Sequence, residues 1–447
     1  GLASSLQGRH VTMIAIGGII GAGLFVGSST SIASVGPAVT LSYAIAGALV
    51  MLVMRMLSEM AVAVPSVRSF PEFTRHALGH WAGFLSGWLY WYFWVVVVAI
   101  EAIAGAVIIH GWLPQFAVWQ IGVALMAALT LVNLASTRSY GEFEFWFSSI
   151  KVAAIIVFIL MAGLYACGIT SPAPTFANLT AHGGFMPFGW TSVFAGATSV
   201  VFALCGAEIA TIAAAESAEP SQAVARMTGS VAVRILAFYM LSMLLIVAIV
   251  PWDRITPGRS PFAQALGSMG IPGAAEAMTA IVLVAVLSCL NSGLYVTSRV
   301  LFVLAARGDA PQMLVKLSPR QVPARAILFG TSFSYVALFA SVVSPELVFS
   351  FLVNASGALM LIVYLLIGAS QIRLRRQFDR TDPGRLTLRM WLFPGLSYAV
   401  MAGIVIVLLT MAVTPALASQ FYSSLAVTAL CLAMFALTRR HRQRCNA

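Results

Sequence analysis

The chain has 447 residues, of which 60% are hydrophobic and 9% are charged, and its formal net charge is +11. A soluble protein of this size carries about 25% charged residues, so too little polar surface remains for a soluble enzyme. The basic residues are spread over short connecting segments instead of forming one patch, which argues against a nucleic-acid-binding protein.

Apolar runs of about 20 residues, each long enough to cross a hydrocarbon core about 30 Å thick, recur along the whole chain. Proline, glycine or charged residues separate them, at GPA 36–38, WLPQ 112–115, PWDRITPGRSP 251–261, SPE 344–346 and RTDPGR 380–385. We therefore predict an all-α polytopic membrane protein. Its twelve expected transmembrane helices are roughly 11–35, 38–64, 83–111, 115–136, 144–169, 191–217, 228–251, 274–305, 324–343, 346–372, 390–412 and 416–438.

The first apolar segment is rich in glycine. Residues 14–28 read IAIGGIIGAGLFVGS, with glycines at 17, 18, 21, 23 and 27. Because glycine weakens a helix by about 1 kcal/mol relative to alanine, this pattern predicts an interrupted helix. Alternatively, pairs spaced four apart, such as Gly17 with Gly21, are typical of tight helix packing. More apolar segments follow at once, so a removable signal peptide is not predicted.

Span six also contains internal glycines, Gly196 and Gly206, in VFAGATSVVFALCGAEIATIAAAES. The two interrupted segments open what look like two five-helix halves. Transporters often bind substrate where one broken helix from each half meets at the bilayer midplane. Half-helix amino ends attract anions, and unwound carbonyl groups accept from cations, so a zwitterion is the expected ligand. The expected organisation is one domain, 1–447, comprising 11–169, 191–372 and two further helices in 390–438.

Ionisable residues lie at membrane depth in three spans. Glu101 sits in WVVVVAIEAIAG, Lys151 opens KVAAIIVFILMAG, and Glu208 sits in FALCGAEIATIAAAE. Such groups cost several kcal/mol unless they are paired or hydrated, so a functional role is the default interpretation. The alternatives are helix–helix hydrogen bonding for Glu208 and snorkelling to the interface for Lys151. Acids near helix ends are expected to form a cytoplasmic network or gate: Glu59, Glu142 and Glu144.

Arginine and lysine placement predicts the orientation. With both termini in the cytoplasm, all but three of the 25 basic residues fall inside, the exceptions being Arg254 and Arg259 outside and Lys151 within a span. The five cysteines and six histidines are scattered, with no Cys-x-x-Cys pair, so no metal site is predicted. No nucleophile cluster or nucleotide-binding loop is visible, and the protein is not expected to be an enzyme or a primary pump.

Several long motifs resemble one family in order along nearly the whole chain: GGIIGAGLFVGS, MRMLSEMAVAVP, GWLYWYFWVVVVAIEA, YGEFEFWFSSIKV, GAEIATIAAAES and SCLNSGLYVTSRVLFVLAARGDAP. They are similar to the bacterial amino acid transporter family of the amino acid–polyamine–organocation superfamily. Within that family, GAEIATIAAAES and SCLNSGLYVTSR most resemble 4-aminobutyrate (GABA) permeases. A permease for another amino acid, such as β-alanine, proline or an aromatic one, is the alternative.

The resemblance implies a fold of two inverted five-helix repeats plus two helices, with helices one and six broken. It implies proton-coupled import by alternating access across the bacterial inner membrane. The expected partners are an amino acid, a proton and membrane lipid, without cofactor or nucleic acid; the oligomeric state is left open, with a monomer as the working expectation.

The resemblance also implies roles for individual residues. The substrate carboxylate is expected at the N–H groups of Ala22 and Gly23, with Ile19 nearby. The ammonium is expected at carbonyl groups around Phe202, Ala203 and Cys205.

Four charged residues match the positions that the family uses for coupling or for its charged network: Glu101, Lys151, Glu142 and Glu208. Cys289 and Asn291 lie in a region of helix eight that the resemblance links to transport. Because GABA separates its charges by three methylenes, its ammonium could instead approach Glu101 or three further side chains: Asn291, Tyr295 and Ser356.

Overall fold

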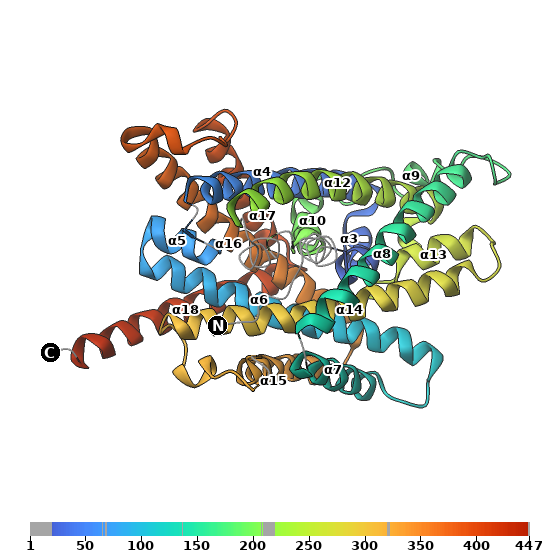
Figure 1. Ribbon diagram of the computed structural model, residues 1–447. Coiled ribbons are helices and arrows are strands. Elements are labelled where there is room, and N and C mark those ends of the chain that lie inside the picture. Colours follow the sequence, from blue (N-terminus) through green and yellow to red (C-terminus); the bar gives the residue numbers. More distant parts are fainter. Residues whose placement is uncertain are drawn as a thin grey trace.

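The computed structural model is a bundle of helices (Figure 1), and its described part contains no strand. It describes residues 20–64, 66–67, 69–135, 137–206, 208, 220–319 and 322–445. For residues 137–142, 220–232, 234–235 and 439–445 the backbone alone is described. The all-α class predicted from the sequence is confirmed within these ranges.

Ten helices of the described chain have 17 or more residues: α4 (Val39–Ala63), α6 (His80–Trp112), α7 (Val118–Ala135), α8 (Thr137–Ala166), α12 (Pro220–Ile249), α14 (Ala274–Ala306), α15 (Ala324–Ala340), α16 (Pro345–Thr381), α17 (Gly395–Val413) and α18 (Ala418–Cys445). The shorter elements are α2 (Ala22–Phe25), α3 (Ser28–Val35), η1 (Gly36–Ala38), α5 (Phe70–Leu78), α9 (Asn178–Ala181), α10 (Gly189–Leu204), η2 (Trp252–Arg254), α13 (Pro261–Ser268), η3 (Gln312–Val315) and η4 (Pro383–Arg385).

Eight apolar helical stretches in the described residues are long enough to cross a membrane, and three shorter apolar helices accompany them. The chain is therefore a multi-pass membrane protein. The count of twelve spans stays a prediction, because parts of the first and sixth predicted spans, including 11–19 and 209–217, lie outside the described residues.

Proline and glycine set the helix ends where the sequence predicts breaks. Pro345 stands in the first turn of α16, and the Ser344 hydroxyl accepts the Leu347 N–H at 3.4 Å. Proline lacks the N–H that would be unpaired there, and serine satisfies one of the remaining donors. Gly36 has a φ of +78°, which favours glycine, at the turn between α3 and α4.

The described residues include part of each predicted interruption. In the first span, α2 begins after the extended residue Gly21 and ends at Phe25, and α3 begins at Ser28. In span six, α10 ends at Leu204 and the extended residue Cys205 follows it. Helix one is therefore interrupted within the described residues, between α2 and α3. In span six the described residues show where α10 ends, and the remainder of the predicted break lies outside them.

The broken helices lie inside the bundle. In Figure 1, α10 is near the middle, and it packs against α2, α3, α4, α16 and α17. Around it, α6 packs along α14 and α4 packs along α12. These are matching helices of the two predicted halves, although the division into two inverted repeats remains a prediction.

Candidate functional site

A small cavity lies where the two broken helices meet α6 and α14. Its lining residues are Gly21, Gly23, Phe93, Trp94, Val97, Glu101, Phe202, Cys205 and Cys289. Its volume is about 10 Å³, which is about the space that one water molecule needs. An amino acid can enter only if the surrounding helices move apart.

The Glu101 side chain is the charged group of this cavity. It is 1% exposed, and both of its carboxylate oxygens lie 3.2 Å from the Ala22 backbone nitrogen, which donates to them. Hydrogen bonds to an ionised carboxylate are stronger than bonds between neutral groups. The Ala22 N–H, predicted to bind the substrate carboxylate, therefore donates in this conformation to a carboxylate of the protein itself.

Gly23 lets α2 approach the end of α10 closely. A Cβ added at Gly23 would lie 2.7 Å from Ala203 Cα and 3.3 Å from Phe202 Cε1. Cys205, one residue beyond α10, lines the same cavity. The structure thus brings together the predicted carboxylate and ammonium residues of both broken helices, except Ile19, which lies outside the described residues.

Glu208 stabilises the open end of α10. Its carboxylate accepts the Gly206 N–H at 2.8 Å and the hydroxyl of Tyr364 from α16, and the side chain is fully buried. Cys205 Sγ lies 3.8 Å from the same Tyr364 hydroxyl. These contacts match the hydrogen-bonding alternative for Glu208 and place it beside the cavity without lining it.

Lys151 is buried on α8 beside a carboxylate. Its Nζ lies 3.7 Å from Glu144 Oε1, and both side chains are fully buried. The same oxygen accepts the Ser288 hydroxyl of α14 at 2.5 Å. Lys151 therefore does not extend to the surface. Glu142 belongs to the backbone of α8, but its side chain lies outside the described part.

Glu144 is a functional candidate that the sequence underrated, because it was assigned to a helix-end network. The spacing of seven residues to Lys151 puts the two side chains on the same helix face. That spacing was the signal available in the sequence. In the structure, Glu144 and Lys151 form an ion pair within α8, in which each charge compensates the burial of the other.

The cavity lining does not include three side chains predicted for the ammonium of a longer substrate: Asn291, Tyr295 and Ser356. Asn291 Oδ1 accepts from Asn133 Nδ2 of α7 at 2.6 Å. The Arg299 guanidinium lies 4.0 Å from the Tyr295 ring centroid, and the Ser356 hydroxyl donates to the Leu352 carbonyl at 2.5 Å. Their role in binding stays a prediction that requires movement.

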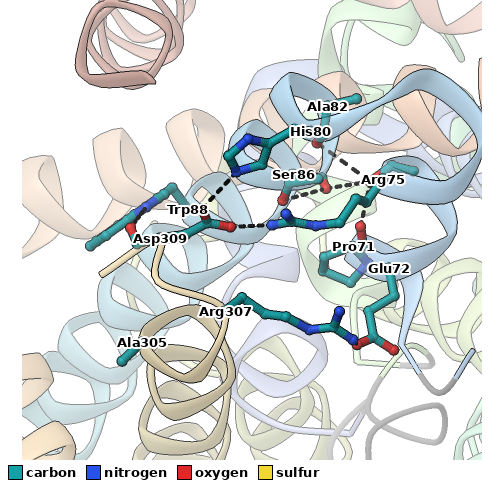
Figure 2. Close-up of polar contacts among 12 residues, drawn as sticks. Pro71, Glu72, Arg75, His80, Ala82, Ser86, Trp88, Ala305, Arg307 and Asp309 are labelled. Atoms are coloured by element: carbon teal, nitrogen blue, oxygen red, sulfur yellow. Dashed lines mark hydrogen bonds and ion pairs between the residues drawn. The ribbon is translucent and has the colours of Figure 1, made fainter. Parts of the chain in front are cut away.

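A second polar cluster joins α5 to the start of α6 and the end of α14 (Figure 2). The Asp309 carboxylate, 1% exposed, pairs with Arg75 and lies 2.7 Å from His80 Nε2. Trp88 Nε1 donates to the Asp309 carbonyl at 3.1 Å, and Arg307 pairs with a glutamate of α5. These contacts fasten the short helix α5 to two long ones.

Among the described residues no group of three or more histidine, cysteine, aspartate or glutamate side chains could hold a metal ion. The charged groups of the central region are thus carboxylates, a lysine and backbone donors. Such groups can bind an amino acid and a proton.

The chain matches the family described as "Amino acid permease" over residues 10–446. It is 46% identical over 444 residues to the "Gamma-aminobutyric acid permease" of Bacillus subtilis (strain 168), covering 99% of this chain and 95% of that relative.

It is also 41% identical over 435 residues to the "Aromatic amino acid transport protein AroP" of Corynebacterium glutamicum, covering 95% and 92% of the two chains. The crystal structure of a manganese transporter from Eremococcus coleocola matches with a TM-score of 0.58 at 12% identity, covering 96% of this chain and 92% of that one. This last likeness shows a shared fold.

Proposed function

Because this chain belongs to the amino acid permease family, we propose that it is a secondary active transporter that imports GABA or a related ω-amino acid together with protons. The observation that carries the proposal is the hydrogen bond from the Ala22 N–H to the Glu101 carboxylate, at the junction of both broken helices. A backbone donor that already binds one carboxylate can bind the carboxylate of an amino acid.

The rest of the cavity suits a substrate with separated charges. The substrate carboxylate replaces Glu101 at Ala22, and the ammonium lies toward the carboxyl end of α10, where helix carbonyl groups carry partial negative charge. Between these two ends, Phe93, Trp94 and Val97 form an apolar wall. That wall would contact the methylenes of an ω-amino acid.

The same contact supplies a mechanism for proton coupling. If the substrate carboxylate binds at Ala22 while Glu101 is ionised, two like charges share one site and repel each other. A proton on Glu101 removes this repulsion, so proton and substrate favour each other's binding, and this coupling is reciprocal. Glu101 is therefore the proposed proton-carrying group.

Buried Lys151 contributes a positive charge near the centre of the protein, which disfavours a bound sodium ion and favours protons as the coupling ion. Each inward proton yields about 2.3 kcal/mol per 100 mV. A tenfold concentration ratio corresponds to about 1.4 kcal/mol, so at 100 mV one proton supports about 40-fold accumulation of a zwitterion.

The distribution of arginines supports an inner-membrane protein with both termini in the cytoplasm.

Uptake of labelled GABA into proteoliposomes with an imposed proton gradient tests the proposal. Glu101→Gln, a neutral mimic of the protonated side chain, should lose gradient-driven accumulation by tenfold or more (about 1.4 kcal/mol or more) but retain exchange of labelled for unlabelled GABA. Glu276→Gln is the matched control, because Glu276 is an exposed acid in the first turn of α14. Undiminished accumulation by Glu101→Gln would overturn the role of Glu101.

An aromatic amino acid is the second candidate substrate. The identity to the aromatic transporter and the rings of Phe93, Trp94 and Phe202 around the cavity favour it. Competition against labelled GABA separates the two candidates. β-Alanine and 5-aminovalerate should compete better than alanine and phenylalanine; if phenylalanine competes better than unlabelled GABA, the ω-amino acid assignment is wrong.

A further inference from the structure

An open groove of about 740 Å³ lies between the last turns of α16 and the first turns of α17. Its lining residues are Ala369, Ile372, Arg373, Arg376, Gln377, Arg380, Thr381, Tyr398 and Met401. None of these residues lines the central cavity. At the deeper end the two helices touch, because a Cβ added at Gly368 would lie 3.1 Å from Met401 Cγ.

Three exposed arginines of α16 line this groove. Arg373, Arg376 and Arg380 are spaced by three and four residues, so their side chains share one face of the helix. The lining includes no acidic residue, and within the described chain none of the three arginines forms an ion pair. No acidic side chain of the described chain therefore pairs with this cluster of positive charge.

The neighbouring arginine shows the contrast. Arg375 projects to the other side of α16, where it is 8% exposed and pairs with Glu59 and with Asp379. The carboxylate of Asp379 is thus engaged away from the groove. Arg376 instead donates to the Tyr398 hydroxyl at 2.9 Å, across the gap to α17. Arg376 is thus held across the groove, and among the described residues no acidic side chain pairs with it.

The apolar part of the groove distinguishes a lipid from a soluble anion. At about 1.5 Å per residue, the 37 residues of α16 span about 55 Å, more than a hydrocarbon core of about 30 Å. Its last turns therefore reach the headgroup level. From Tyr398 an apolar stripe continues inward along α17 through the half-buried Met401 to Val405 and Leu409, which are 40% and 56% exposed.

We propose that this groove binds an anionic phospholipid, with the headgroup phosphate at Arg373, Arg376 and Arg380 and an acyl chain along the apolar stripe of α17. Arginine recognises phosphate by parallel charge-assisted hydrogen bonds. Basic pockets between transmembrane helices at the headgroup level bind anionic lipid in the same way. The site is independent of the substrate and of proton coupling.

Native mass spectrometry of the purified protein, titrated with phosphatidylglycerol or phosphatidylcholine, tests the proposal. Arg376→Gln/Arg380→Gln should weaken phosphatidylglycerol binding about 25-fold, about fivefold for each charge near an anionic headgroup. Lys316→Gln/Arg325→Gln is the control, because it removes two exposed charges from other elements of the same predicted side. The control should change binding by less than about twofold.

Two further measurements keep the result interpretable. Arg376→Lys/Arg380→Lys retains both charges and should keep most of the affinity, which excludes misfolding as the cause of a loss. Inorganic phosphate at millimolar concentration should not displace the lipid. Equal binding of both lipids, equal losses in the test and control variants, or displacement by inorganic phosphate would each overturn the proposal.

Discussion

Replacing Gly23 by alanine inserts one methyl group between the two broken helices. The added Cβ would lie 2.7 Å from Ala203 Cα and 3.3 Å from the Phe202 ring. Non-bonded carbon atoms pack at about 3.5–4.0 Å, so the end of α10 has to move by about 1 Å. Extra methyl groups in a well-packed interior cost about 1–3 kcal/mol.

This cost falls on the closed arrangement, in which the cavity has room for about one water molecule. Admitting a substrate separates α2 from α10 and relieves the clash. A bias of about 1–3 kcal/mol against the closed state corresponds to a population shift of about 5- to 150-fold. Since alternating access requires closure around the substrate, we expect initial GABA uptake to fall within that range, while binding to the open form persists.

Initial uptake rates in proteoliposomes, together with thermal unfolding of the purified protein, measure the effect. Gly163→Ala is the control, because a Cβ at Gly163 on α8 meets no atom within 4 Å. It should leave uptake unchanged and stabilise the helix by up to about 1 kcal/mol. Uptake by Gly23→Ala within about twofold of the unmodified protein (less than about 0.5 kcal/mol) would refute the reasoning.

Two further predictions concern the buried charges. Lys151→Met removes the ammonium 3.7 Å from Glu144 and should abolish uptake and lower the unfolding free energy by about 3–5 kcal/mol. Adding Glu144→Gln should restore stability but not uptake. A double variant as unstable as the single one would contradict the pairing. Asp309→Asn removes the charge shared by Arg75 and His80 and should lower the unfolding free energy, measured by thermal unfolding, by about 3 kcal/mol. The control Asp253→Asn, at a side chain that is 45% exposed, should lower it by less than about 1 kcal/mol. Similar losses in both variants would be inconsistent with a structural role of the Asp309 cluster.

Helix ends were predictable from the sequence because proline and glycine act locally. Pro345 and Gly36 mark turns that the structure contains, and the glycine-rich segment predicted the interruption between α2 and α3. The short helices Phe70–Leu78 and Pro261–Ser268 were missed. They are too short to appear in a search for apolar runs of about 20 residues.

The contacts of the site were less predictable. Glu101 and Ala22 are 79 positions apart, and no local pattern shows that they share a hydrogen bond. The family resemblance drew attention to Glu142, whereas the seven-residue spacing favours Glu144 as the partner of Lys151. The direction of Asn291 depends on the rotation of α14 about its axis, and a helix that is apolar on nearly all sides gives no periodicity from which to predict it.

If the substrate carboxylate binds the Ala22 N–H as proposed, the Glu101 carboxylate competes with it for that donor as part of the same chain. A group on the same chain has an effective local concentration in the millimolar range or above. Free substrate would therefore have to displace an intramolecular carboxylate. On that proposal, the Glu101 contact to the Ala22 N–H lowers the affinity of the resting protein for its substrate. It would also favour release, because Glu101 can return to the Ala22 N–H as the substrate leaves.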